Sequence, residues 1–134
     1  MTNPIDTEIS VDPSIDVDNL RVPPLFIQPY VENAIWHGLA PKKEDLRLII
    51  RIIKQPDGYS FEIEDNGIGR QLSALNRRAD QHVSKGLELA RETFERYGHV
   101  YHKRTDVEIL ELVDADGHAS GTRVILKLAS LSQI

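Results

Sequence analysis

Two short turn sequences, each lying between apolar stretches, constrain the fold of this chain more than any other feature. The first turn is Pro56-Asp57-Gly58, between the predicted strands 46–54 and 59–64. The second turn is Asp114-Ala115-Asp116-Gly117, between the predicted strands 107–113 and 122–128. Tight turns favour Asp, Gly and Pro, and strands joined by such turns pair antiparallel. The chain therefore contains two β-hairpins, which excludes an alternating fold of parallel strands and helices.

Three further elements follow from the spacing of apolar residues. Residues 5–11 alternate between apolar and polar side chains, which predicts a half-buried strand. Apolar residues recur every three or four positions from Phe26 to Ile35, which predicts a helix that begins near Pro23-Pro24 and stops near Gly38. Pro29 lacks a backbone donor, so it predicts a kink or a late start to the regular helix. Residues 84–97 form a second predicted helix, closed by Gly98.

The order of these elements predicts an α+β fold. A strand and a helix precede the first hairpin, and a polar segment of residues 71–83 and a helix precede the second. The economical packing is a two-layer α/β sandwich, with a mixed, mostly antiparallel sheet covered on one face by helices. At 134 residues the chain fits one domain, residues 1–134.

Charge and cysteine content exclude several classes of function. The chain has no cysteine, which excludes a disulfide scaffold, a thiolate metal site and a cysteine nucleophile. Its formal net charge is −5, so it has no overall positive field that would attract nucleic acid. Affinity for an anion would have to come from a bound cation, helix N-termini and a few local basic residues.

One candidate site lies on the first predicted helix. Asn33 and His37 are four residues apart and share a helix face, next to Glu32. A side-chain amide oxygen is a hard neutral ligand that suits a Mg²⁺ ion carrying phosphate oxygens. The simpler interpretation is an asparagine and a histidine on a solvated helix face.

Two glycine-containing segments form further candidates, and each also has a plainer explanation. Asp65-Asn66-Gly67-Ile68-Gly69 ends a predicted strand, where the carboxylate can accept hydrogen bonds from a ligand amine; the same string is also a common turn. Ser84-Lys85-Gly86-Leu87 begins the second predicted helix, where backbone N–H groups can bind phosphate; Ser84 can equally be an ordinary N-cap.

The order of these segments resembles the ATP-binding domain of the GHKL superfamily, which has the Bergerat fold. Within it, the string Q-P-Y-V-E-N-A-I-W-H-G at residues 28–38 resembles the N box of LytS/YehU-type sensor histidine kinases. The resemblance spans residues 5–129 and implies a polar ATP lid between residues 70 and 85.

The resemblance also implies roles for individual residues, with ATP and Mg²⁺ as cofactors. Asn33 would coordinate the Mg²⁺ that bridges the ATP phosphates, with Glu32 and His37 as catalytic residues on the same side. Asp65 would bind the adenine amino group, with Thr122 nearby. The remaining implied ATP-binding residues shape the adenine wall and the two ends of the lid: Gly67, Gly69, Lys85, Gly86 and Leu87.

Three positions depart from the family pattern. Ser84 stands where the second glycine motif of the family has its first glycine, and Trp36 stands where a lysine is common. Pro29 stands where gyrase-type relatives carry the glutamate that activates water, which argues against an ATP hydrolase of that type. None of the five histidines lies in the acceptor string of the family, so this chain is expected to bind ATP without phosphorylating itself.

The sequence therefore predicts the catalytic domain of a larger sensor kinase, which transfers the γ-phosphate of ATP to a histidine of an adjoining dimerisation domain. The expected partners are that domain and a response regulator of LytTR type, with no nucleic acid and no direct membrane contact. The expected location is the cytoplasm, with the parent at the inner or plasma membrane. Two alternatives are a docking module with the same fold and a protein-serine kinase of the anti-sigma type.

Overall fold

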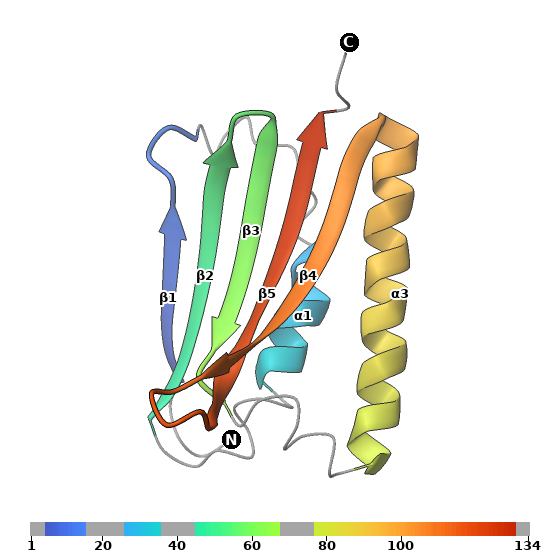
Figure 1. Ribbon diagram of the computed structural model, residues 1–134. Coiled ribbons are helices and arrows are strands. Elements are labelled where there is room, and N and C mark those ends of the chain that lie inside the picture. The colour runs from blue at the N-terminus through green and yellow to red at the C-terminus, as the bar shows by residue number, and fades with distance from the viewer. Residues whose placement is uncertain (1–4, 16–25, 36–44, 68–76, 131–134) are drawn as a thin grey trace.

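The computed structural model describes residues 5–15, 26–35, 45–67 and 77–130. The elements follow the predicted order (Figure 1). They are β1 (Ile5–Val11), α1 (Gln28–Asn33), β2 (Leu46–Gln55), β3 (Gly58–Asp65), α3 (Arg77–Tyr101), β4 (Lys103–Val113) and β5 (Ala119–Ser130). None of the helices in the described part of the chain is long and apolar enough to cross a membrane.

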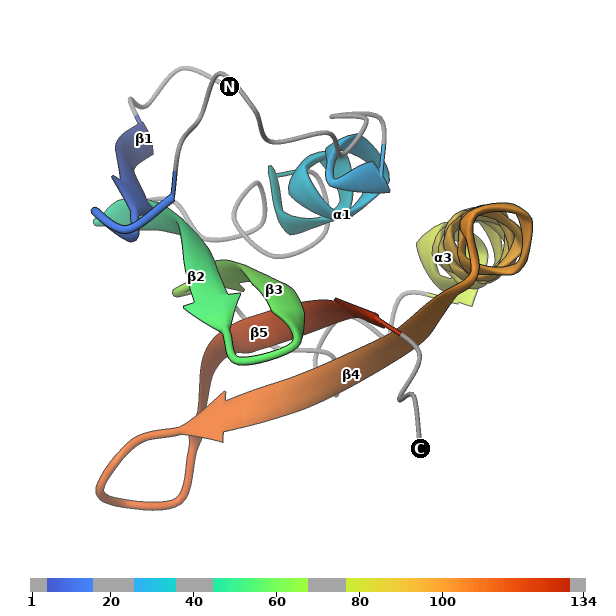
Figure 2. The same cartoon turned by 90° about the horizontal axis from the view of Figure 1, so that it is seen from above.

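The strands form one mixed sheet in the order β1-β2-β3-β5-β4. Strands β1 and β2 pair in parallel, and the other neighbouring pairs are antiparallel. Both predicted hairpins are present, β2–β3 and β4–β5. Figure 2 shows α1 and α3 on the same side of the twisted sheet, with the other side uncovered by either helix. The predicted two-layer α+β architecture is therefore confirmed.

The core lies between the helices and one face of the sheet. Alternate residues of β2, β3 and β5 face it, as a side-chain period of two requires. The buried apolar residues are Ile15, Phe26, Tyr30, Ala34, Leu46, Leu48, Phe61, Ile63, Phe94, Val124, Leu126 and Leu128. Phe26, two residues before α1, meets Phe94 of α3 edge-on with ring centroids 5.3 Å apart. The apolar stripe predicted for the first helix is thus its buried face.

The helices differ from the prediction at their ends. The regular turns of α1 begin at Gln28, with Pro29 in the first turn, which agrees with a late start to the regular helix. The predicted start near Pro23-Pro24 and the predicted stop near Gly38 lie outside the described residues. α3 begins at Arg77 rather than Ser84, which places the second half of the predicted lid segment in a helix. The rest of that segment, residues 68–76, lies outside the described residues.

The predicted helix stop at Gly98 is wrong, because α3 continues to Tyr101. A Cβ atom at Gly98 would lie 2.7 Å from Cγ2 of Thr105 and 2.8 Å from the carbonyl oxygen of Lys103. Gly98 therefore allows α3 to pack closely against β4. The helix ends at Tyr101, and the next residue, His102, has a φ of 56°.

β1 is a strand as predicted, but it is not half-buried in the alternating way that its sequence indicates. Ile9 is 65% exposed, and the residues from Asp6 to Ser10 are all exposed. The strand lies at the sheet edge, so only one side of it has a neighbour. The alternation of apolar and polar residues thus predicted the strand correctly, but it predicted the wrong degree of burial.

Candidate functional site

The site begins with a buried polar pair at the end of β3. Asp65 is the last residue of that strand and lies opposite Thr122 of β5. Their exposed fractions are 5% and 7%. Burial of a carboxylate is costly unless hydrogen bonds compensate for the lost water, and Oδ1 of Asp65 accepts one from the backbone N–H of Gly67 at 2.9 Å. The structure thus brings together three of the predicted site residues.

Gly121 allows the close approach of β5 to this pair. Its φ is +147°, and a Cβ atom there would lie 2.0 Å from the carbonyl oxygen of Asp65. It also lies at an irregularity in the β4–β5 pairing, where Leu112 pairs with Gly121 and Val113 pairs with Ala119. Glycine is the residue that such a bulge and such a contact require. The sequence showed a glycine before a predicted strand but gave no sign of the backbone it approaches.

Asn33 is the last residue of α1, and its side-chain oxygen is buried. Within the described residues, Oδ1 of Asn33 has no hydrogen-bond partner. A buried acceptor without a partner costs about 1–3 kcal/mol of stability, a cost that a ligand atom bound to this oxygen would offset. An amide oxygen held in this way fits a hard cation such as Mg²⁺.

The arrangement of the elements brings these residues to one end of the molecule. In Figure 1, α1 runs downward, so that its C-terminal end, the end of β3 and the start of β5 all lie at the lower end of the sheet. α3 also begins at that end. Asn33, Asp65 and Thr122 belong to these three segments.

The other predicted site residues are placed as follows. Glu32 is exposed, and its Oε1 accepts a hydrogen bond from Nε2 of Gln28 at 3.0 Å. Leu87 is partly buried and packs against the apolar core. Gly86 lies inside α3 rather than at its start, and a Cβ atom there would meet nothing within 4 Å. Lys85 lies in the same helix. His37 and Gly69 lie outside the described residues.

Asn66 contributes to the site in a way that the sequence did not indicate. It was part of a turn string, yet its side chain joins β3 to the start of β2. Its Oδ1 accepts a hydrogen bond from the backbone N–H of Arg47 at 2.7 Å, and its Nδ2 donates to the carbonyl of Asp45 at 2.6 Å. Asparagine is common in turns for local reasons, so only the tertiary structure shows this link.

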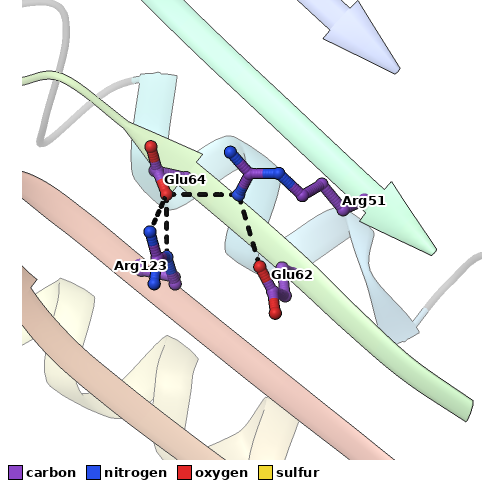
Figure 3. A network of polar contacts seen from close by, with 4 residues as sticks. All are labelled: Arg51, Glu62, Glu64 and Arg123. Carbon is purple, nitrogen blue, oxygen red and sulfur yellow. Dashed lines mark hydrogen bonds and ion pairs between the residues drawn. The ribbon is translucent and has the colours of Figure 1, made fainter. Parts of the chain in front are cut away.

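On the opposite face of the sheet, an ion-pair network lies next to the buried pair (Figure 3). Glu64 precedes Asp65 and pairs with Arg123, which follows Thr122. Oε1 of Glu64 accepts a 2.7 Å hydrogen bond from Nε of Arg123 and a 3.2 Å bond from Arg51, which also contacts Glu62 at 3.3 Å. The network ties β2, β3 and β5 together beside the site.

The network predicts an acid-sensitive contribution to stability. Partial burial acts to raise the pKa of Glu64, but hydrogen bonds from Arg123 and Arg51 outweigh it, so the pKa lies below its usual 4.5. A depressed carboxyl pKa stabilises the fold fully above that usual value, and the contribution is lost as the pH falls below it. We expect Glu64→Gln to lower the free energy of unfolding by about 1–2 kcal/mol at pH 7 and by much less at pH 3.

Urea denaturation at both pH values measures this effect. The matched control is Glu108→Gln, whose carboxylate contacts Lys127 at 3.7 Å with both side chains about half exposed. Its loss should be a few tenths of a kcal/mol at either pH. A pH-independent loss in Glu64→Gln would contradict the prediction.

Two surface hollows lined by described residues lie away from this site. The larger, of about 580 Å³, lies near the β2–β3 turn, where Asp57 pairs with Arg104 at 3.0 Å. The smaller, of about 360 Å³, lies beside the C-terminal end of α3. Three exposed side chains in the β4–β5 turn, Asp114, Asp116 and His118, could also approach a metal ion. Asp114 uses its Oδ1 to accept two backbone N–H bonds within that turn, which explains it structurally.

Comparison with known proteins shows which proteins this chain resembles. No family model matches the chain. It is 36% identical over 81 residues to the uncharacterised protein YwpD of Bacillus subtilis, covering 57% of this chain and 29% of that protein. It is 34% identical over 88 residues to the sensor protein LytS of Oceanobacillus iheyensis, covering 60% of this chain and 15% of that protein.

A histidine kinase domain from the blue-light activated kinase of Erythrobacter litoralis EL346 aligns with 96% of this chain and 56% of its own, at 17% identity and a TM-score of 0.49. The matched segments make up less than a third of YwpD and of LytS. The sequence matches confirm the resemblance to LytS-type sensor histidine kinases that the string around Asn33 indicated.

Proposed function

We propose that this LytS-related chain is the Mg-ATP-binding catalytic domain of a sensor histidine kinase. In the full-length parent it would transfer the γ-phosphate of ATP to a histidine of an adjoining dimerisation domain. The observation that carries the proposal is the gathering, at one end of the sheet, of a buried carboxylate and hydroxyl and of a buried amide oxygen without a partner among the described residues.

Asp65 and Thr122 are suited to hold the adenine base. A buried carboxylate accepts a hydrogen bond from an exocyclic amino group strongly, because the acceptor is charged and shielded from water. The Thr122 hydroxyl can donate to or accept from a neighbouring ring nitrogen. On the other side of Asp65 its partner on β2 is Leu48, which is buried and supplies an apolar surface beside the pair.

Asn33 is suited to ligate the Mg²⁺ ion that accompanies ATP. When bound, that ion would neutralise charge on the phosphates. Because the amide ligand is neutral, it does not cancel the positive charge of the ion. The end of α1 fixes the position of the amide oxygen. Glu32 and His37 remain candidates for contact with the phosphates. The remaining candidates for contacts with ATP are Gly67, Gly69, Lys85, Gly86 and Leu87.

Phosphoryl transfer depends mainly on positioning and on electrostatic stabilisation of the reacting groups. The proposal therefore needs no general base in this chain, and Pro29 is consistent with that. The nucleophilic histidine would come from the adjoining domain. A response regulator, of LytTR type by the resemblance, would then accept the phosphoryl group.

The experiment is to incubate the full-length parent with γ-labelled ATP and Mg²⁺. We expect label on the protein that is stable to base and lost in acid, as for phosphohistidine, and we expect Asn33→Ala to abolish it. Acid-stable label, which indicates phosphoserine, would favour a serine kinase instead. No label above that of the Asn33→Ala variant would contradict the proposal.

A further inference from the structure

The residue after Asp65 makes three hydrogen bonds, two to Arg47 of β2 and one to Asp45, which directly precedes β2. The backbone N–H of Asn66 donates to the carbonyl of Arg47 at 3.2 Å. Its side-chain oxygen accepts from the N–H of Arg47 at 2.7 Å, and its side-chain nitrogen donates to the carbonyl of Asp45 at 2.6 Å. The regular β2–β3 pairing ends one residue earlier, at Leu48 and Asp65.

The Asn66 side chain therefore continues the hydrogen bonding between β2 and β3 beyond the last backbone pair. A carboxamide carries one acceptor and two donors on adjacent atoms, as a peptide group carries one of each. At the end of β3 it can satisfy the backbone N–H of Arg47 in β2 and the carbonyl of Asp45 just before β2. Alanine would satisfy neither, and aspartate would satisfy only the N–H of Arg47.

This clamp bears directly on the Asp65 carboxylate. The backbone on the C-terminal side of Asp65 is fixed by Asn66, and the carboxylate itself accepts from the N–H of Gly67, one residue further on. The position of Gly67 depends on how Asn66 is held, because the two are adjacent. Asp45, the other anchor, has a φ of 56°, which is uncommon for a residue other than glycine. This positive φ sets the orientation of the Asp45 backbone, whose carbonyl accepts the bond from Asn66.

We propose that Asn66 is a positioning residue, which holds the Asp65 carboxylate at the angle needed to select a nucleobase with an exocyclic amino group. It acts through Asp65 and does not itself contact the base. The inference rests on the proposed function, because it assumes that Asp65 reads the 6-amino group of adenine.

The test compares ATP with purine riboside triphosphate, which lacks only the 6-amino group. Calorimetry should show that the unaltered chain binds ATP about 10–100-fold more tightly, the range for one hydrogen bond to a charged acceptor. In Asn66→Ala we expect this ratio to fall to about 3-fold or less, with affinity for the analogue changed less than about 2-fold. Asn66→Asp, which keeps one of the two side-chain bonds, should show an intermediate ratio.

A matched control comes from the other end of the sheet. Asp12 follows the last residue of β1, and its carboxylate accepts bonds from the N–H and hydroxyl of Ser14 at 3.0 and 2.8 Å and from the N–H of Lys54 at 3.4 Å. Asp12→Ala removes a similar post-strand clamp far from Asp65. It should lower the melting temperature while leaving the ratio unchanged.

The outcomes separate the inference from its premise. If the unaltered chain binds both nucleotides equally, Asp65 does not read the amino group, and the proposed adenine site fails together with the inference. If the unaltered chain discriminates and Asn66→Ala loses affinity for both nucleotides in proportion, Asn66 is only structural and the inference is overturned. Asn66→Ala should also add no further loss of discrimination in an Asp65→Asn background, because both changes act on one interaction.

Discussion

Gly121→Ala should destabilise the chain by about 3 kcal/mol or more and should abolish nucleotide binding. The added methyl group would lie 2.0 Å from the carbonyl oxygen of Asp65, where backbone rather than a flexible side chain must move. The φ of +147° adds strain for any residue with a side chain. Because overpacking and backbone strain each cost about 1–3 kcal/mol, the sum is large.

The control isolates the contact from the strain. Gly117 also has a positive φ, of +83°, but a Cβ atom there meets nothing within 4 Å. Gly117→Ala should therefore cost only about 1–2 kcal/mol, the penalty of the left-handed conformation. Urea denaturation of both variants measures the difference. Equal losses would mean that the close approach of β5 to Asp65 does not occur in solution.

Asn33→Ala should reduce affinity for Mg-ATP at least about tenfold without lowering stability. Among the described residues the buried Asn33 oxygen has no hydrogen-bond partner, so we expect alanine at this position to break no hydrogen bond with them. Alanine is also the better helix former, by up to about 0.7 kcal/mol. A variant that loses function while its melting temperature stays equal or rises identifies a residue kept for ligand binding.

The measurement is nucleotide titration with and without Mg²⁺, beside a thermal melt. In the unaltered chain Mg²⁺ should strengthen binding, and in Asn33→Ala this gain should disappear. Gln55→Ala removes an exposed amide at the other end of β2 and should change neither quantity. A fall in melting temperature together with unchanged Mg²⁺ dependence would show that Asn33 supports the fold instead.

The hairpins and the apolar faces were predictable because they depend on local chemistry. Asp-Gly turns favour tight reversals, and alternation in residues 59–64 and 122–128 marks one buried face. The start of α3 was missed because the residues from Arg77 to Val83 are polar. Polarity placed this stretch in the predicted lid segment and not in the helix, although its arginine, alanine and glutamine residues are good helix formers.

The residues proposed to bind the ligand were predictable from the sequence, but the residues that hold the surrounding elements in place were not. The motif around Asn33 and the string beginning at Asp65 marked two segments that the fold brings to one end of the sheet. Gly98, Gly121 and Asn66 act through contacts between elements far apart in the sequence. Their residue types have ordinary local explanations as a helix stop, a strand flank and a turn, so only the packed structure distinguishes their roles.

The central claim is that Asp65 and Asn33 belong to one Mg-ATP site, and calorimetry with a non-hydrolysable ATP analogue tests it most directly. With Mg²⁺ present, the unaltered chain should bind with a dissociation constant of about 1 mM or lower, and Asp65→Asn and Asn33→Ala should each weaken binding at least about tenfold. An absence of binding near millimolar nucleotide, or equal affinities in all three proteins, would contradict the account.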